Sequence, residues 1–452
     1  MEMTQTAENK MGIMPENKLL LSMSLPMMAS MLVQALYNIV DSIFVARISE
    51  NALTAVSLAF PLQTLMIALG GGTGVGVNAL LSKALGEKDY KLVNKVANNG
   101  VFLSVVNALI FVLVGVFAVK PFYLSQTIDT EIVAYGVEYL SIVCCCSIGI
   151  YTQFIFEKLL QSTGNTFYTM ITQATGAIIN LILDPILIFG LFGLPELGVA
   201  GAAIATVAGQ IVAGILAIVI NEKKNHEVNV SLKGFKPCGN TIKRIYIVGV
   251  PSIIMQSIGS IMVYGMNKIL MAFSSTAAAV FGIYFKLQSF IFMPIFGLNN
   301  GMVPIIAYNY GARHRKRMTK TIKLSVAYAV TIMAIGTLVF QLIPDKLFML
   351  FDASEHMLSM GVPALRIISL HFIIAGFCIV AGSVFQALGN AVYSMINSIC
   401  RQLVVLLPAA YILARIGGVN YVWWSFPIAE LMSLIMSVIF MIKIYKDIIS
   451  KV

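Results

Sequence analysis

The feature that most constrains this chain is a series of about twelve apolar runs, each roughly 18 residues or longer. A helix of about 20 apolar residues crosses a hydrocarbon core of about 30 Å and satisfies its own backbone hydrogen bonds there. Hydrophobic residues make up 58% of the 452-residue chain and charged residues only 11%, a balance that excludes a water-soluble domain of this size. The sequence therefore predicts an all-α integral membrane protein. The runs lie near residues 19–46, 53–81, 96–118, 132–158, 167–192, 197–220, 242–272, 277–308, 321–342, 358–386, 391–415 and 421–444.

Positive charge is distributed unevenly between the segments that connect these runs. If the N-terminus is cytoplasmic, the inner segments hold 21 lysine and arginine residues and the outer segments hold 4. An excess of this kind on the inner side sets the orientation of membrane proteins. We therefore expect a multi-pass protein of the cell (plasma) membrane with both termini in the cytoplasm. The formal charge of +10 then reflects topology and contact with anionic lipid of the bilayer, and no nucleic-acid partner is expected.

Other sequence signals exclude several classes of function. The first 18 residues are polar and no cleavable apolar core follows them, so the first run is expected to be a retained helix. The six cysteines lack the spacing of metal ligands or disulfide frameworks, and we expect them to be packing residues. The segment GGGTGVG at 70–76 has no Lys-Ser/Thr after it, which favours close helix packing over phosphate binding. Without a His-Glu metal motif or a Ser-His-Asp set, we expect no enzyme and no cofactor.

The chain also aligns with itself at a single offset of 225 positions. The segment LQSTGNTFYTMI at 160–171 falls on FQALGNAVYSMI at 385–396, and the two share six residues in register. Six helices followed by six in the same orientation predict a parallel repeat of two pseudo-twofold related lobes with a cleft between them. The predicted lobes are residues 1–220 and 242–452, joined by a cytoplasmic linker at 221–241. Further pairs at this offset are Pro26 with Pro251, Gln63 with Gln288, Gly86 with Gly311 and Lys91 with Lys316.

Two aspartates lie inside apolar runs of the first lobe, where a charge costs roughly 2.5 to 3.5 kcal/mol on insertion scales. Asp41 lies six residues before Arg47, and Asp184 lies nine residues before Gly193. At about 1.5 Å of rise per residue, both are expected at similar depths in the outer half of the bilayer. They can therefore share one pocket, where desolvation and like-charge repulsion would strengthen the binding of a proton.

The neighbours of these aspartates favour an ion site. Asn180 precedes Asp184 by four residues and Tyr37 precedes Asp41 by four, so each polar side chain is on the helix face of its acid. Pro185 cannot donate a backbone hydrogen to the carbonyl four residues earlier, and we expect the helix to bend there. A free carbonyl beside a carboxylate suits a proton or a small cation.

Alternatives stay open for the acidic residues of this lobe. Each aspartate could instead pair with a buried cation and hold helices together. The candidate cation is Lys158, which is expected at the inner end of its helix, far from both aspartates. Glu157 could line the cleft as part of a substrate pocket, or it could reach inner-face water beside Lys158.

The second lobe has a different set of charges. At the offset of 225, Met266 and Ala409 stand where the first lobe has its aspartates, so the acidic pair has no copy. The lone histidine within its apolar runs, His371, is of a kind more often found as a satisfied packing residue than as a proton relay. The roles of the remaining charged residues are open. The ionisable residues within its apolar runs are Lys286, Arg366, His371, Arg401 and Glu430.

At these residues the sequence resembles the multidrug and toxic compound extrusion (MATE) family, in its MepA-like bacterial branch. The resemblance covers nearly the whole chain and is most specific in NLILDPILIFG together with the internal offset. It implies twelve helices in two lobes, a V-shaped cleft, and export of bulky, often cationic, amphiphilic compounds driven by protons or sodium ions. The other matching segments are SLPMMASMLVQALYNIVDSIFVAR, LQSTGNT, GVAGAAIATVAGQ, FGIYFKLQSF, MPIFGLNNGMVPIIAYNYGA and PIAE.

Position by position, the resemblance implies a coupling site and an adjoining pocket in the first lobe. The implied cation or proton site is Asp41, Asn180 and Asp184, with sodium possible at the two aspartates. The implied pocket residues are Gln34, Tyr37 and Thr206. NorM-type relatives use acidic residues in helices 7 and 10, and this chain has none there, which places the coupling ion in the first lobe.

The predicted function is a secondary active exporter that exchanges drugs or toxic metabolites against protons, or less favourably sodium, by alternating access. Pro26 and Pro185 are the predicted hinges, since each lies within a helix that contains one of the aspartates. A monomer is expected. The alternative function is a lipid-linked precursor flippase of the same superfamily, which would need a basic cleft for a pyrophosphate.

Overall fold

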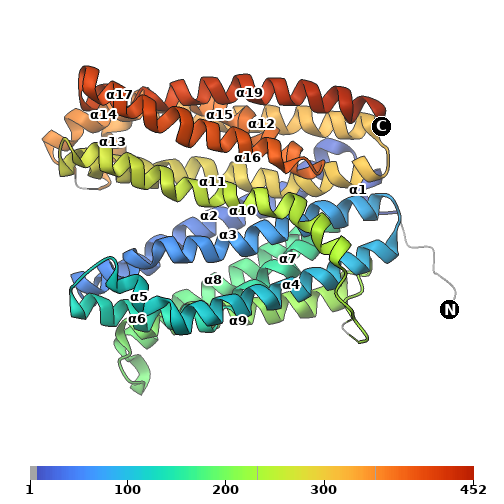
Figure 1. Cartoon of the computed structure of the whole chain (residues 1–452), viewed down its shortest axis with the longest axis horizontal. Coiled ribbons are helices and arrows are strands. Elements are labelled where there is room, and N and C mark those ends of the chain that lie inside the picture. Colours follow the sequence, from blue (N-terminus) through green and yellow to red (C-terminus); the bar gives the residue numbers. More distant parts are fainter. Residues whose placement is uncertain (1–7, 232, 352) are drawn as a thin grey trace.

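The computed structural model describes residues 8–231, 233–351 and 353–452. Within these ranges the chain forms helices and connecting turns, with no strand. Figure 1 shows the helices running along one long axis in two stacked bundles, which we call the first lobe (α2 to α9) and the second lobe (α10 to α19). The predicted all-α architecture of two lobes is confirmed. The boundaries at residues 220 and 242 stay a prediction.

The helices of the first lobe and its N-terminal extension are α1 Lys10–Ile13, α2 Glu16–Ala46, α3 Glu50–Gly86, α4 Tyr90–Phe117, α5 Val119–Leu124, α6 Thr130–Cys145, α7 Ile148–Ser162, α8 Thr166–Phe189, the 3-10 turn η1 Leu191–Gly193 and α9 Gly198–Lys224. Those of the second lobe are α10 Gly239–Met271, α11 Ser275–Gly311, α12 Arg315–Leu342, α13 Pro344–Met349, α14 Glu355–Ser369, α15 Phe372–Ala387, α16 Ala391–Ile399, the π-helical turn η2 Cys400–Leu406, α17 Leu407–Gly417, α18 Val419–Val422, α19 Ser425–Asp447 and the 3-10 turn η3 Ile449–Lys451.

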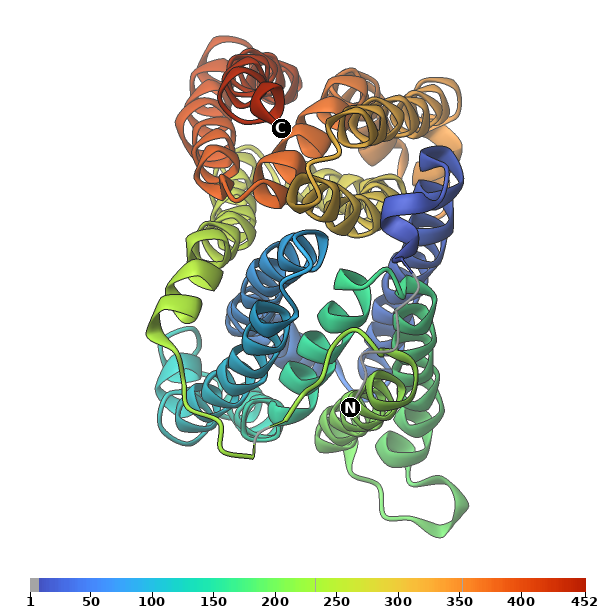
Figure 2. The ribbon, with the colours of Figure 1, turned by 90° about the vertical axis from the view of Figure 1, so that its right-hand side faces the viewer.

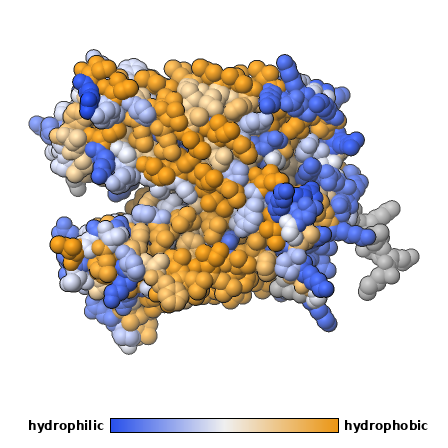
Figure 3. Space-filling view, viewed as in Figure 1, coloured by the Kyte–Doolittle hydropathy of each residue, from blue (hydrophilic) through white to orange (hydrophobic). Residues whose placement is uncertain are grey.

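Ten of the described helices are long and apolar enough to cross a membrane, and up to twelve spans result if each bent pair counts as one. The bent pairs are α6 with α7, at 45°, and α14 with α15, at 49°. The predicted number of twelve is confirmed on that count. Figure 3 shows apolar surface along the flank and hydrophilic surface toward both ends, so the long axis of the molecule lies across the bilayer.

The two lobes repeat each other at the level of single helix ends. Helices α3, α4 and α5 begin and end 225 positions before α11, α12 and α13, respectively. Ser49 caps α3 by accepting a hydrogen bond from the backbone N–H of Ala52, and Ser274 caps α11 in the same way from Ala277. A serine at this position satisfies one of the N–H groups that a helix start leaves unpaired. The repeat in the sequence therefore fixes the helix ends as well as the order of the helices.

Glycines let the two lobes approach at the end of the molecule that bears both termini, which we call the termini face (Figure 1). A Cβ at Gly72 of α3 would lie 2.8 Å from the backbone nitrogen of Ile253 in α10. A Cβ at Gly297 of α11 would lie 2.6 Å from the backbone nitrogen of Met28 in α2. Both glycines and both partners are 225 positions apart, so one contact is the copy of the other. GGGTGVG is therefore a helix-packing segment, as the sequence predicted.

A second reciprocal contact closes the termini face. A Cβ at Gly86 would overlap the carbonyl oxygen of Tyr308, and a Cβ at Gly311 would overlap the carbonyl oxygen of Lys83. The ends of α3 and α11 thus cross backbone against backbone, which only glycine permits. Figure 2, which looks at this face, shows α2 and α10 at opposite seams between the lobes.

The lobes separate at the opposite end, which we call the open face. Figure 3 shows a hollow between them on that side. The molecule is therefore closed at the termini face and open at the other, the arrangement expected for one end state of a cleft between two lobes.

Candidate functional site

The structure brings together the two aspartates that the sequence singled out. Asp41 lies on α2 and Asp184 on α8, and their carboxyl groups are within hydrogen-bonding reach of each other. Asp184 is completely buried, and Asp41 is half-buried. The structure therefore places the two acids side by side in the first lobe, where the sequence predicted that they share one pocket.

Asn180 and Thr206 complete the polar lining of this pocket. The side-chain amide of Asn180 lies 3.4 Å from Oδ1 of Asp184 and donates a hydrogen bond to Oγ1 of Thr206 at 3.2 Å. The phenol of Tyr37, on α2, lies near the Thr206 hydroxyl. Thr206 lies on α9, so three helices contribute to one polar group.

A pair of glycines explains why α9 can come so close to α8. A Cβ at Gly209 would lie 2.6 Å from the carbonyl oxygen of Gly176 and 3.4 Å from the Cβ of Asn180. Any larger residue at 209 would push α9 away. Small residues at such contacts let membrane helices approach and let polar side chains meet. Gly209 therefore positions Thr206, one turn earlier on α9, against Asn180.

Three buried oxygen atoms in this pocket have no hydrogen-bond partner. They are Oδ1 of Asp41, Oδ1 of Asn180 and Oδ2 of Asp184. Among the described residues, no lysine, arginine or histidine lies within 4.0 Å of either carboxylate. Burying unpaired acceptors and unpaired charge is costly, so such groups bind a proton or a cation, or they neutralise. Neither aspartate is therefore paired with a buried cation among the described residues, which was the alternative interpretation of these acids.

The two predicted hinge prolines lie inside long helices. Pro26 is within α2 and Pro185 is within α8, which continues to Phe189 and ends at Gly190 with a left-handed φ of 67°. Because Pro185 has no N–H, the α8 carbonyl one turn before it lacks its usual donor. Whether either proline bends during function stays a prediction.

Gln34 lies on α2 itself. Two residues that the sequence did not assign to the site, Gln63 of α3 and Tyr139 of α6, lie near this helix. Gln34 is exposed, and its amide approaches Oδ1 of Asn38 at 3.4 Å. Tyr139 of α6 is buried close to Asp41, and its hydroxyl accepts a hydrogen bond from Gln63 at 3.1 Å. Gln63 is one of the residues shared by the two repeats, and this sharing was the signal in the sequence that could have pointed to it. Tyr139 is not shared between the repeats, so the sequence holds no comparable signal for it.

Glu157 lies in a separate polar cluster. It is 2% exposed, and its carboxylate accepts hydrogen bonds from Gln153 at 2.9 Å, Thr172 at 2.8 Å and Gln173 at 2.8 Å. Thr172 is twelve residues before Asp184 on α8, which is about 18 Å along a helix. The structure therefore does not bring Glu157 to the paired aspartates. It also shows Glu157 held by three donors, not left to inner-face water.

The second lobe has its acid paired. Nη1 of Arg401 lies 3.0 Å from Oε2 of Glu430, whose side chain is 3% exposed. Arg401 belongs to the π-helical turn η2, a distortion often found at functional positions. The ring of His371 stacks on Phe426 at 5.9 Å between centroids. This lobe thus has a neutralised ion pair, whereas the first lobe has two unpaired acids.

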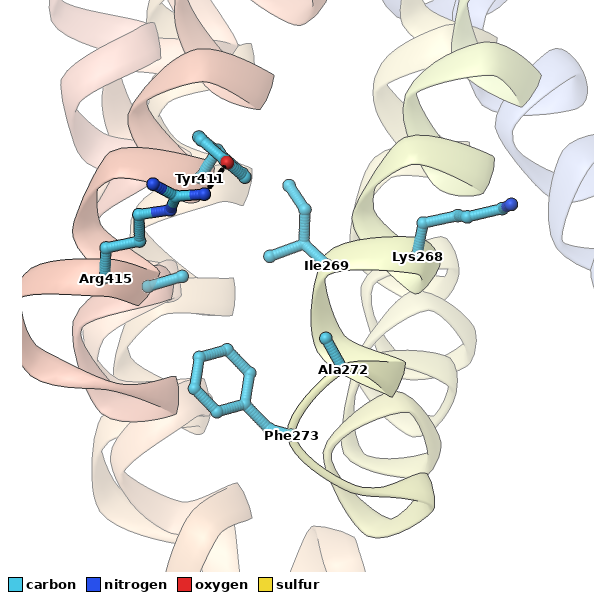
Figure 4. Close-up of a pocket in the computed structure, with 7 residues that line it drawn as sticks. Lys268, Ile269, Ala272, Phe273, Tyr411 and Arg415 are labelled. Carbon is cyan, nitrogen blue, oxygen red and sulfur yellow. Dashed lines mark hydrogen bonds between the residues drawn. The ribbon is translucent and has the colours of Figure 1, made fainter.

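A cavity of about 540 Å³ lies at the open-face end of the second lobe, between α10 and α17 (Figure 4). Ile269, Ala272 and Phe273 point toward it, while the Lys268 side chain extends away from it. At the equivalent place in the first lobe, Phe44 and Phe189 pack edge to face, with 6.5 Å between their ring centroids. These two rings correspond, at the offset of 225, to Ile269 and to Ala414, which also lines the cavity.

Two repeated six-span lobes, a cleft open at one face and unpaired buried acids define the class of membrane transporters built from parallel repeats. A model of the MatE family matches residues 26–186 and 251–412, more than half of the chain, and the chain therefore belongs to this family. The two matched segments begin 225 positions apart and so confirm the internal repeat.

The comparisons with individual proteins agree with that assignment. The chain is 28% identical to the multidrug export protein MepA of Staphylococcus haemolyticus (strain JCSC1435), over 91% of this chain and 90% of that protein. It is also 28% identical to MepA of Staphylococcus aureus (strain MRSA252), over 92% and 91% of the two chains.

Solved structures share the fold over the full length. One is described as the outward-facing conformation of a multidrug resistance MATE family transporter of the MOP superfamily; its TM-score is 0.93, with 25% identity and 100% of both chains covered. Another, a crystal structure of MATE in complex with MaL6, gives a TM-score of 0.92 at 25% identity and covers 99% of this chain and all of that one.

Proposed function

We propose that this protein is a secondary active multidrug exporter that exchanges amphiphilic, often cationic organic compounds against protons by alternating access. Sodium is the less favoured coupling ion. The observation that carries the proposal is the contact between Asp41 and Asp184 in a pocket with no basic partner among the described residues. The names of the MepA relatives support the class of cargo.

The chemistry of the pocket supports exchange between an ion and a cationic drug. Two carboxyl groups in contact cannot both be charged without a large repulsion, so they bind one proton or one cation between them. When that ion is bound, the pocket carries one negative charge fewer and holds a cationic drug more weakly. When the ion leaves, negative charge returns and favours the drug. Binding one therefore disfavours the other, which is the requirement for antiport.

The neighbouring polar groups are proposed to orient both ligands. Asn180 and Thr206 hold the Asp184 carboxyl in place, and Tyr37 and Gln34 line the adjoining space on α2. Oxygen acceptors of this kind also suit sodium, which prefers hard ligands. Ion binding between α2 and α8 would change how these helices pack, and Pro26 and Pro185 are the proposed hinges within them.

We further propose that the termini face is cytoplasmic and that the protein works as a monomer in the plasma membrane. The 21 inner and 4 outer basic residues support this orientation. The hollow at the open face would then face the exterior (Figure 3).

Dye transport in everted vesicles tests the proposal. Asp41→Asn and Asp184→Asn should each reduce gradient-driven uptake at least tenfold, because an amide cannot exchange a proton, while the protein stays folded and membrane-inserted. Asp345→Asn is the matched control, since Asp345 is exposed on α13 and forms no ion pair. Undiminished uptake by Asp184→Asn would defeat the proposal.

The identity of the ion and of the cargo can be measured in the same preparation. Adding a candidate drug to reconstituted protein should release lumenal protons with or without sodium; release only with sodium would reverse the assignment of the ion. A lipid-linked precursor flippase would instead scramble labelled lipid. One of its candidate cations, Arg401, is already bound by Glu430.

A further inference from the structure

A half-buried lysine bridges the two lobes below the paired aspartates. Lys158 lies on α7 of the first lobe, and its Nζ donates to Oδ1 of Asn300 on α11 of the second lobe at 3.0 Å. The same ammonium group donates to Oε1 of Gln161 at 2.9 Å. Within the described parts of the chain, no carboxylate lies within 4.0 Å of it. Lys158 is therefore a membrane cation held only by neutral amides.

The surroundings of Lys158 direct it across the seam. Its neighbour Glu157 is turned toward α8, where Thr172 and Gln173 donate to it, so the adjacent acid does not take the ammonium. Gly74 of α3 makes room for the stem, because a Cβ there would lie 2.8 Å from Cγ of Lys158. A charged side chain within a membrane span is costly and is retained for a reason that folding alone does not give.

This bridge differs from the reciprocal glycine contacts described above, because it has no copy in the repeat. The counterparts of Lys158 and Asn300 at the offset of 225 are Ser383 and Val75, which cannot form the same bond. The copied glycine contacts provide close packing of the lobes. The uncopied bond adds a charge-assisted interaction, which is stronger than a neutral hydrogen bond.

We propose that Lys158 is a latch that holds the lobes together at the floor of the cleft through its bond to Asn300, and that the bond breaks when the termini face opens. The proposal rests on alternating access, as stated under the proposed function. In the present state, closed at the termini face, the bond favours that closure. When the lobes part there, water replaces Asn300 as the partner of the ammonium group, and the cation is no longer held at the seam.

Distances between the lobes at the termini face test the latch directly. Lys91 on α4 and Lys316 on α12 are exposed repeat-equivalent positions next to the crossing of α3 and α11. Spin labels attached there through unnatural amino acids leave the six native cysteines in place. The distance distribution is recorded by pulsed electron resonance in detergent, without drug and without an ion gradient. The result therefore does not depend on whether the protein transports any compound.

Variants of the two bonded residues should act in opposite directions. Lys158→Met keeps the volume and removes the bond, and it should raise the ratio of long to short distances roughly tenfold, as expected for one hydrogen bond to a charged group. Asn300→Asp would turn the bond into an ion pair and should lower that ratio. The double variant Lys158→Met with Asn300→Ala should match Lys158→Met alone, because the bond is already lost.

Lys268→Met is the matched control, because this membrane lysine lies over the ring of Tyr264 on its own helix and makes no bond between lobes. Its distance distribution should equal that of the unaltered protein. The latch is overturned if Lys158→Met leaves the distribution unchanged, or if Asn300→Asp raises the long population. Monodisperse elution of each variant excludes misfolding as the cause. Loss of dye transport by Asp184→Asn with no distance change in Lys158→Met would sink the latch and leave the exporter intact.

Discussion

The two lobes share one frame and differ in their charges. Helices α3, α4 and α5 have the same lengths as α11, α12 and α13, α3 and α11 share a serine cap, and each lobe has one bent pair of helices. Yet the first lobe holds two aspartates with no basic partner among the described residues, and the second holds Glu430 bonded to Arg401. The copied residues thus determine packing, and the uncopied residues determine chemistry. The candidate site is formed by residues that the second lobe does not repeat.

The same contrast appears at the open-face ends of the lobes. Phe44 and Phe189 fill the space between α2 and α8, and the smaller Ile269 and Ala414 leave the cavity between α10 and α17 (Figure 4). The equivalent places of the two lobes thus hold side chains of different size. A repeated backbone therefore does not guarantee a repeated interior.

The largest effect is expected where the two halves copy each other. Gly86→Ala and Gly311→Ala should each cost about 3 kcal/mol or more, because a Cβ would overlap a backbone carbonyl of the other lobe that cannot move freely. If the repeat makes the contacts equivalent, both variants should lower the thermal midpoint in detergent by similar amounts. Gly282→Ala on α11 is the control, since a Cβ there meets nothing within 4 Å. A large effect at only one glycine would break the equivalence.

The next effect concerns the paired acid of the second lobe. Glu430→Gln should destabilise the protein by about 1 to 3 kcal/mol, because it weakens the bond to Arg401 and leaves that cation without its counter-charge. Thermal unfolding in detergent measures this loss. Replacing both partners, as in Glu430→Gln with Arg401→Met, should recover much of it. Full stability of Glu430→Gln alone would show that the pair is not structural.

The acids of the first lobe should respond in the opposite way. Asp184→Asn removes a charge that lacks a basic partner, and we expect the free energy of unfolding to stay unchanged or to rise by about 1 kcal/mol. The same thermal scan used for Glu430→Gln makes the comparison direct. Destabilisation of equal size at both positions would contradict the distinction between a functional and a structural acid.

The smallest effect is expected in the cavity of the second lobe. Ala414→Phe restores the residue type of the first lobe at that position and should stabilise the protein by no more than about 1 kcal/mol, since it fills only part of the space. Dye transport should not change, because the cavity lies apart from the paired aspartates. Ala272→Phe, on the facing wall, serves as a comparison for added volume without the repeat equivalence. A strong loss of transport in Ala414→Phe would assign the cavity a functional role.

Much of the fold was predictable because its signals are local. The spans follow from hydrophobic length, the lobes from the offset of 225, and the caps of α3 and α11 from serines just before each run. The approach of Asp41 to Asp184 was also predictable, because depth in a bilayer follows from counting residues to the helix end. Charge inside an apolar run is rare enough to mark a site without any knowledge of the fold.

Other parts of the site could not be derived in this way. Nothing in the sequence shows that Tyr139 approaches Asp41, that Glu157 binds Thr172, or that Lys158 reaches Asn300. These contacts join residues from different helices, and they depend on how each helix is rotated and how closely it packs.

The sequence by itself determined the number of spans, the repeat and the presence of two aspartates inside apolar runs of the first lobe. These follow from the cost of exposing polar groups to lipid, which acts on each segment separately. Only the tertiary structure decided which acids stay unpaired, which one is neutralised by Arg401, and that Lys158 reaches Asn300 of the other lobe. The reason is that a partner for a buried charge is chosen by distances of a few ångströms, and those distances are set by glycine contacts between helices far apart in the chain.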